Sequence, residues 1–141
     1  MSDRKPYYYV AGPYTALDSK VQEDRETQHC VLSAELLKAG YLVYSPIAET
    51  ANLAKYGSML GTNWDTWREK DLRQLEMSDG MIILTLPGWE ASRGLRGEIK
   101  YCIIYGIPMF ILSQELMCLL PVNEEDILEM LKLESADELN D

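Results

Sequence analysis

Residues 81–112, MIILTLPGWEASRGLRGEIKYCIIYGIPMFIL, decide the fold that the sequence predicts. The stretch 81–86 is almost wholly apolar, which is typical of a strand buried on both faces of a sheet. A glycine-containing loop follows, then a predicted helix over 95–105 closed by Gly106, and then a second apolar strand over 108–112. A strand, a helix and a strand joined by short connections form a right-handed crossover, so the two strands are predicted to be parallel.

The same alternation extends toward the N-terminus. Strands are predicted over 7–11, stopped by Gly12-Pro13, and over 41–45, stopped by Pro46. Between them the spacing of apolar residues predicts a helix from 18 to 39. Its predicted buried face comprises Cys30, Val31, Ala34 and Leu37, with Gly40 ending the helix.

Two more helices complete the pattern. One is predicted over 64–77 with Asn63 as its cap, and one over about 123–133, followed by a polar tail. The pattern over residues 47–61 is ambiguous, and a short helix and a loop are expected there. We therefore predict an α/β fold, a three-layer α/β/α sandwich with a mainly parallel sheet of four to five strands, flavodoxin- or Rossmann-like. Residues 1–141 are predicted to form a single domain with an acidic C-terminal helix and tail from about residue 123.

Composition excludes several classes of protein. The chain has 141 residues, of which 47% are hydrophobic and 26% charged, so it is neither disordered nor fibrous. Its formal charge is −10, which argues against a nucleic-acid polymer or an anionic membrane as partner. Residues 124–141 hold eight acidic residues and one basic residue, so the rest of the chain carries only −3.

The cysteines and the histidine bear on compartment and metal binding. Three cysteines are widely spaced without a Cys-x-x-Cys pair, and His29 is the only histidine, which argues against a zinc site. Cys30 and Cys102 lie in apolar stretches and are predicted to be buried, and His29 is predicted to lie inside the first helix, away from the strand ends. No signal peptide or apolar run of ~18 residues is present. We expect a cytoplasmic protein with no membrane partner, no metal and no organic cofactor.

In parallel sheets the ligand binds outside the carboxyl ends of the strands, which directs attention to residues 12–15, 45–49 and 87–94. In the last of these loops the glycines allow close backbone approach and Ser92 precedes a helix N-terminus, where N–H groups favour an anion. Glu98 follows one turn later. A capping serine and a first-turn glutamate also stabilise a helix without any ligand, so both interpretations remain open here.

Other candidate residues also have two interpretations. Asp71 stands between Lys70 and Leu72 and is either a solvated helical acid or a buried functional one. Trp64 and Trp67 share a helix face and either stack on a planar base or pack in the core. The 12–15 loop lacks the glycine patterns of P-loops and dinucleotide-binding sites. Carboxylates, hydroxyls and anion-binding backbone together suit cleavage of a glycosidic bond.

Four motifs resemble those of a known superfamily. The motifs are Ala-Gly-Pro-Tyr at 11–14, Ser-Pro-Ile-Ala at 45–48, Trp-x-x-Trp at 64–67 and Gly-Trp-Glu-x-Ser-x-Gly-x-x-x-Glu at 88–98. In this order they resemble the nucleoside deoxyribosyltransferase superfamily, and most closely a bacterial and phage branch of unassigned function. The resemblance extends from about residue 7 to 112. Ser-x-Gly-x-x-x-Glu, which includes Gly94, is similar to the signature of the nucleoside 5′-monophosphate N-glycosidases.

The resemblance implies roles for individual residues. Glu98 acts on the anomeric carbon and Tyr9 orients it, while Asp71 protonates the departing base or positions it. Ser92 binds the 5′-phosphate, where related transferases acting on free nucleosides carry an acid, and the loop containing Gly12 and Pro13 wraps the sugar and phosphate. The resemblance gives no role to Arg93 and Arg96, but both stand beside Ser92 in the sequence and are expected to add positive charge there. Relatives often carry a histidine after Ser-Pro-Ile-Ala, where this chain has Glu49, so base preference does not transfer.

We therefore expect an N-glycosidase that hydrolyses the base–sugar bond of nucleoside or deoxynucleoside 5′-monophosphates, releasing free base and sugar 5-phosphate. The alternatives are a deoxyribosyltransferase that exchanges bases and a non-catalytic nucleotide-binding module, with cleavage of a larger nucleotide such as NAD as a further option. The resemblance also implies a homo-oligomer, and we expect a dimer.

Overall fold

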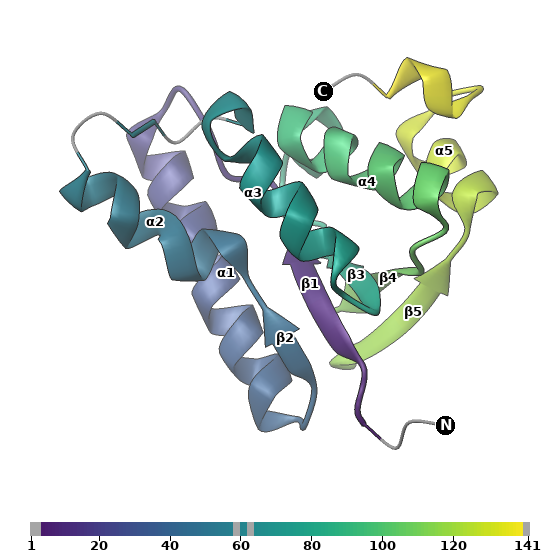
Figure 1. The fold of residues 1–141 in the computed structure, drawn as a ribbon, viewed down its shortest axis with the longest axis horizontal. Helices are drawn as coiled ribbons and strands as arrows, with labels where there is room; N and C mark the ends of the chain where they lie inside the picture. The colour runs from purple at the N-terminus through teal and green to yellow at the C-terminus, as the bar shows by residue number, and fades with distance from the viewer. Residues whose placement is uncertain (1–3, 58–59, 62–63, 140–141) are drawn as a thin grey trace.

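Five strands form one sheet in the order β2-β1-β3-β4-β5 in the computed structural model, which describes residues 4–57, 60–61 and 64–139 (Figure 1). The strands are β1 (Tyr7–Ala11), β2 (Leu42–Tyr44), β3 (Gly80–Ile83), β4 (Met109–Ser113) and β5 (Cys118–Val122). The first four are parallel, and β5 pairs antiparallel with β4. The mainly parallel sheet is the one that the sequence predicts.

Four of the described helices form the crossovers between the parallel strands, and the last helix follows β5. The helices are α1 (Ser19–Lys38), α2 (Pro46–Tyr56), α3 (Trp64–Glu76), α4 (Arg93–Tyr105) and α5 (Glu124–Leu131), with short 3-10 turns η1 (Trp89–Ala91) and η2 (Ala136–Glu138). The expected short helix after Ser45 extends over residues 46–56, because the Ser45 side chain accepts from Ala48 N–H and Pro46 occupies the first turn. The predicted cap Asn63 lies outside the described residues.

Alternation along the strands separates two helical layers. Tyr9 and Ala11 of β1 point into a core shared with α3, α4 and α5. Val10, between them, points into a second core that α1 closes with Leu32 and Leu36. α1 and α2 pack together, as do α3 and α4 (Figure 1). The molecule is thus the predicted three-layer α/β/α sandwich, with a Rossmann-like arrangement.

Strand β5 is the element whose position the sequence did not indicate. It contains Pro121, which pairs with Phe110 at the edge of the sheet. Proline lacks the N–H that a central strand must donate, so it interrupts a strand pattern in the sequence but is tolerated at a sheet edge.

The predicted buried face of α1 is wrong. Cys30, Val31, Ala34 and Leu37 are exposed, and the helix instead buries His29, Leu32, Ser33 and Leu36. Apolar residues lie on several sides of α1, so their spacing did not single out one face. The contact surface was decided by the fit to the sheet, and it includes two polar side chains. Cys102, by contrast, is buried as predicted.

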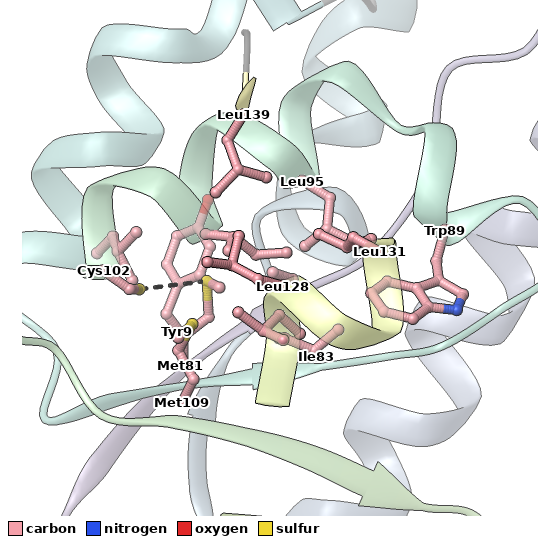
Figure 2. Packing of buried hydrophobic residues seen from close by; sticks show 14 residues of the cluster. Tyr9, Met81, Ile83, Trp89, Leu95, Cys102, Met109, Leu128, Leu131 and Leu139 are labelled. Carbon is pink, nitrogen blue, oxygen red and sulfur yellow. Dashed lines mark hydrogen bonds between the residues drawn. The ribbon is translucent and has the colours of Figure 1, made fainter. Parts of the chain in front are cut away.

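The C-terminal segment is more than a polar tail. The acidic residues between 124 and 138 lie at the surface, but Leu128, Leu131 and Leu139 pack into the core that contains Tyr9 (Figure 2). Leu139 is 0% exposed. The last described residue therefore belongs to the hydrophobic core that supports the sheet. None of the described helices has the length and apolar character that crossing a bilayer requires.

Candidate functional site

A cleft of about 690 Å³ opens at the carboxyl ends of β1 and β3. These two strands are neighbours, but the helices that follow them, α1 and α4, cover opposite faces of the sheet. The connections that leave these two strands therefore diverge to opposite faces of the sheet and leave a crevice between them, as is usual for ligand sites in open parallel sheets. The cleft is lined by residues 12, 14–17 and 25, by one side of α2, by α3 residues 64, 67 and 71, and by residues 88, 91–95 and 98.

Glu98 lies at the base of this cleft. It comes from the second turn of α4, and its carboxylate accepts a hydrogen bond from the Tyr9 hydroxyl. Tyr9 is 0% exposed and does not line the cleft, so it supports Glu98 from behind, within the core. The sequence-predicted pairing of these two residues is therefore present.

Burial dominates the chemistry of Glu98. Loss of water raises its pKa to about 8, the hydrogen bond from Tyr9 opposes that shift, and the charge of Asp71 adds to it. The pKa of Tyr9 is also raised well above its usual value, by burial and by the nearby carboxylates. Tyr9 is therefore a protonated donor at neutral pH, and Glu98 is an acid that readily holds a proton.

Asp71 is buried and not a solvated surface residue. It lies on α3, is 7% exposed and lines the cleft. Burial raises its pKa to about 6, and Lys70 partly offsets that rise. Its Oδ1 atom is buried without a hydrogen-bond partner among the described residues. A buried acceptor of this kind is available to a ligand group that donates or shares a proton.

The β1–α1 loop approaches the site over His29. Gly12 lines the cleft, and a Cβ there would lie 2.9 Å from His29 Cε1, so only glycine fits without displacement. His29 Nε2 lies 3.2 Å from the Pro13 carbonyl, and burial lowers the pKa of the histidine to about 4. The neutral ring therefore donates to Pro13. The expectation that His29 lies away from the strand ends is wrong, because one turn of α1 passes under this loop. Pro13 itself does not line the cleft.

Ser92 and Gly94 lie where α4 begins, and both line the cleft. The Ser92 hydroxyl caps the helix by accepting from Leu95 N–H at 3.3 Å. A Cβ on Gly94 would lie 3.2 Å from the Trp64 ring, so this glycine allows the indole to pack closely against the start of α4. The capping interpretation of Ser92 is thus correct, and its position at the cleft leaves the hydroxyl available to a ligand as well.

One end of the cleft is apolar and aromatic. Trp64 is buried with its Nε1 unpartnered among the described residues, and Trp67 Nε1 donates to Gly61 O at 2.8 Å. Both indoles line the cleft, together with Pro46, Ile47, Thr50, Ala51 and Ala54 of α2. Flat apolar walls with an unused indole donor suit a planar heterocycle.

Glu49 does not line the cleft. Its carboxylate accepts from the Ser45 backbone N–H at 2.9 Å and so stabilises the start of α2. Glu49, which stands where the resemblance leads one to expect a histidine, therefore caps a helix and adds no acceptor to the residues that line the cleft.

The positive charge of the site differs from the expectation. Arg93 lines the cleft but makes a bidentate ion pair with Asp65, at 2.9 and 3.0 Å, and Arg96 does not line it. A second arginine, Arg25, also lines the cleft, which it reaches from α1, and the sequence motifs did not indicate it. No motif marks this residue, because it lies inside α1, seven residues beyond the helix cap Asp18.

The cleft thus combines two buried carboxyl groups of different pKa, a hydroxyl at a helix N-terminus, an arginine and an aromatic wall. Such a set can transfer protons and stabilise positive charge at a carbon bound to a planar leaving group. Among the described residues, no three His, Cys, Asp or Glu side chains are placed to hold a metal ion together.

Comparison with models of protein families gives a match over most of the chain. No curated protein is similar to the chain at a significant level. A family model described as a domain of unknown function, DUF1937, matches residues 6–114, which include β1 to β4 and every residue of the cleft. The match extends over most of the chain, and the chain belongs to the DUF1937 family.

Proposed function

We propose that the cleft binds a nucleoside or deoxynucleoside 5′-monophosphate and hydrolyses its base–sugar bond. The observation that carries this proposal is the position of Glu98, buried at the base of the cleft, hydrogen-bonded by Tyr9 and electrostatically coupled to Asp71. Two buried carboxyl groups with separate pKa values are what an acid-assisted glycosidic cleavage requires. The motif resemblance to nucleoside deoxyribosyltransferases supports the same chemistry.

In the proposed reaction the C1′–N bond breaks and its electron pair leaves with the base. Asp71 donates a proton to the base, while the Glu98 carboxylate bonds to C1′ or stabilises the positive charge that develops there. Water then attacks C1′ and gives its proton to Asp71. Where the Glu98–C1′ ester has formed, this attack breaks it, and the electron pair of that bond returns to the Glu98 carboxylate. The products are free base and ribose or deoxyribose 5-phosphate, and both carboxyl groups regain their initial state.

The pKa values indicate how the two groups share a proton. With Asp71 near 6 and Glu98 near 8, the pair holds about one proton at neutral pH, mostly on Glu98. The reaction uses the alternative arrangement, with the proton on Asp71. We expect activity to be highest between the two pKa values, where the pair holds this single proton.

The remaining residues fit the parts of a nucleotide. The indoles of Trp64 and Trp67 face the base, and Ser92 with the first N–H groups of α4 faces the phosphate. The three cysteines are free, which agrees with the cytoplasm as the compartment of this enzyme.

The test is release of base from a panel of ribo- and deoxynucleoside 5′-monophosphates, followed by chromatography. We expect equal amounts of base and sugar 5-phosphate from at least one of them. Glu98→Gln should abolish release, and Asp71→Asn should reduce it by about 10²–10⁴-fold. Glu90→Gln, at an exposed position on η1, is the matched control and should retain full activity.

Four results would contradict the proposal. Absence of base from every nucleotide would exclude hydrolysis, and tight binding without product would favour a non-catalytic nucleotide-binding module. Undiminished release by Glu98→Gln would exclude the assigned mechanism. Exchange of bases on unphosphorylated nucleosides, when a second free base is added, would favour a deoxyribosyltransferase.

A further inference from the structure

We propose that Arg25 of α1 is the counter-ion of the substrate phosphate and makes the site select a 5′-monophosphate over the corresponding nucleoside. This inference rests on the proposed function, since it assigns the phosphate subsite of the same cleft. Arg25 lies outside all four sequence motifs, and it reaches the cleft from the opposite helical layer to Glu98 and Asp71.

The guanidinium of Arg25 lies between the two strand-exit loops. Its Nη1 donates to the carbonyls of Thr15 at 2.9 Å and Tyr14 at 3.4 Å, and its Nη2 donates to Pro87 O at 3.2 Å. These loops follow β1 and β3, the two strands whose carboxyl ends form the base of the cleft. The cation is therefore held at a fixed place beside both loops.

Every one of these partners is a neutral carbonyl. Within the described residues, Arg25 forms no ion pair with a carboxylate, whereas Arg93 is neutralised by Asp65. Arg25 is thus the lining cation whose charge is left uncompensated. A guanidinium with N–H groups to spare and an uncompensated charge favours a phosphate.

The backbone is shaped to leave room for this side chain. Gly88 has a φ of 88°, and a Cβ there would lie 2.5 Å from Arg25 Nη2. Any other residue at this position would strain the backbone and displace the guanidinium. Gly88 also begins the turn that leads through η1 to Ser92, the cap of α4. The same loop therefore packs against Arg25 at one end and presents the Ser92 hydroxyl at the other.

The cleft has an aromatic side with an acidic residue, formed by α3, and a cationic side, formed by Arg25 of α1. The aromatic wall and Asp71 come from α3, while Arg25 enters from α1 on the other side of the crevice. A bound nucleoside monophosphate would place its base on the α3 side and its phosphate between Arg25 and the N-terminus of α4. The sugar then lies between them, at Glu98.

The test measures binding without turnover. In a Glu98→Gln background, calorimetry compares the four 2′-deoxynucleoside 5′-monophosphates with the matching unphosphorylated nucleosides. Adding Arg25→Gln should weaken binding of the monophosphate by about 10–100-fold, the effect of a charge-assisted hydrogen bond, and should change nucleoside binding by less than about threefold. Arg25→Lys should lie between, because it keeps the charge but not the planar fork.

The matched control is Arg73→Gln, which removes the same charge at an exposed position of α3 outside the cleft, and both affinities should stay unchanged. Preserved nucleoside binding shows that the Arg25 variants are folded. An equal loss for nucleotide and nucleoside, or no loss for either, would overturn the assignment of Arg25. If the wild type releases no base but the Arg25 variants lose affinity for the monophosphate alone, the proposed hydrolysis is refuted, whereas the assignment of Arg25 to the phosphate is supported. If no monophosphate binds at all, both are refuted.

Discussion

Glu98→Gln should make the protein more stable above neutral pH, even though it removes the central functional group. The folded-state pKa of Glu98 is about 8, against an ordinary value of 4.5. Between these values the folded protein keeps a proton that the unfolded chain releases. The free energy of unfolding must therefore fall as pH rises through this window, and glutamine, which does not ionise, removes that fall.

The size of the effect follows from the two pKa values. Each pKa unit corresponds to about 1.4 kcal/mol, so the whole window corresponds to about 5 kcal/mol. The total stability of a domain of this size is about 5–15 kcal/mol, so the effect is large. Below pH 4.5 both forms are neutral, and the variant and the wild type should have similar stability, since a glutamine oxygen can still accept from Tyr9.

The assay is urea denaturation at a series of pH values from 4 to 9, for the wild type, Glu98→Gln and the exposed control Glu90→Gln. The difference between Glu98→Gln and the wild type should grow steadily from pH 5 to 8 and then level off. The control should follow the wild type throughout. A constant difference across this range would show that Glu98 is ionised in the folded protein at neutral pH, and would refute the proposed sharing of one proton with Asp71.

Two further predictions concern the support of the site. The pH profile of kcat/KM should be bell-shaped with limbs near 6 and 8. Tyr9→Phe should move the alkaline limb upward by up to about one pH unit, because the lost hydrogen bond favoured the ionised Glu98. An unmoved limb would show that Tyr9 does not act on this carboxyl. Leu139→Ala should lower the free energy of unfolding by about 2–5 kcal/mol, since the side chain is fully buried. Urea denaturation measures this free energy, and a loss below about 0.5 kcal/mol would mean that the C-terminal segment does not contribute to the core.

The sequence predicted the parts of the fold that depend on local patterns. The apolar run at β3, flanked by loops and helices, was sufficient to predict a parallel sheet. Topology then placed the strand-exit loops together, which is why Glu98, Ser92 and Gly12 were predicted to share a site, whereas Asp71 was assigned to that site by the family resemblance alone. These residues do line one cleft.

What the sequence did not predict depends on contacts between distant segments. Local spacing could not show that α1 turns His29 inward, because that choice depends on the fit of a whole helix against the sheet. Leu139 reads as part of a charged tail, yet it fills the core beside β1 and α4. Arg25 looks like an ordinary helical arginine until the loops after β1 and β3 surround it.

The most direct test of the central claim is a crystal structure of the Glu98→Gln variant soaked with a 2′-deoxynucleoside 5′-monophosphate. The account predicts the nucleotide in the cleft, with C1′ facing residue 98, the base beside Trp64 and Asp71, and the phosphate at Arg25. A nucleotide bound in the reverse orientation, or bound outside the cleft, would contradict it.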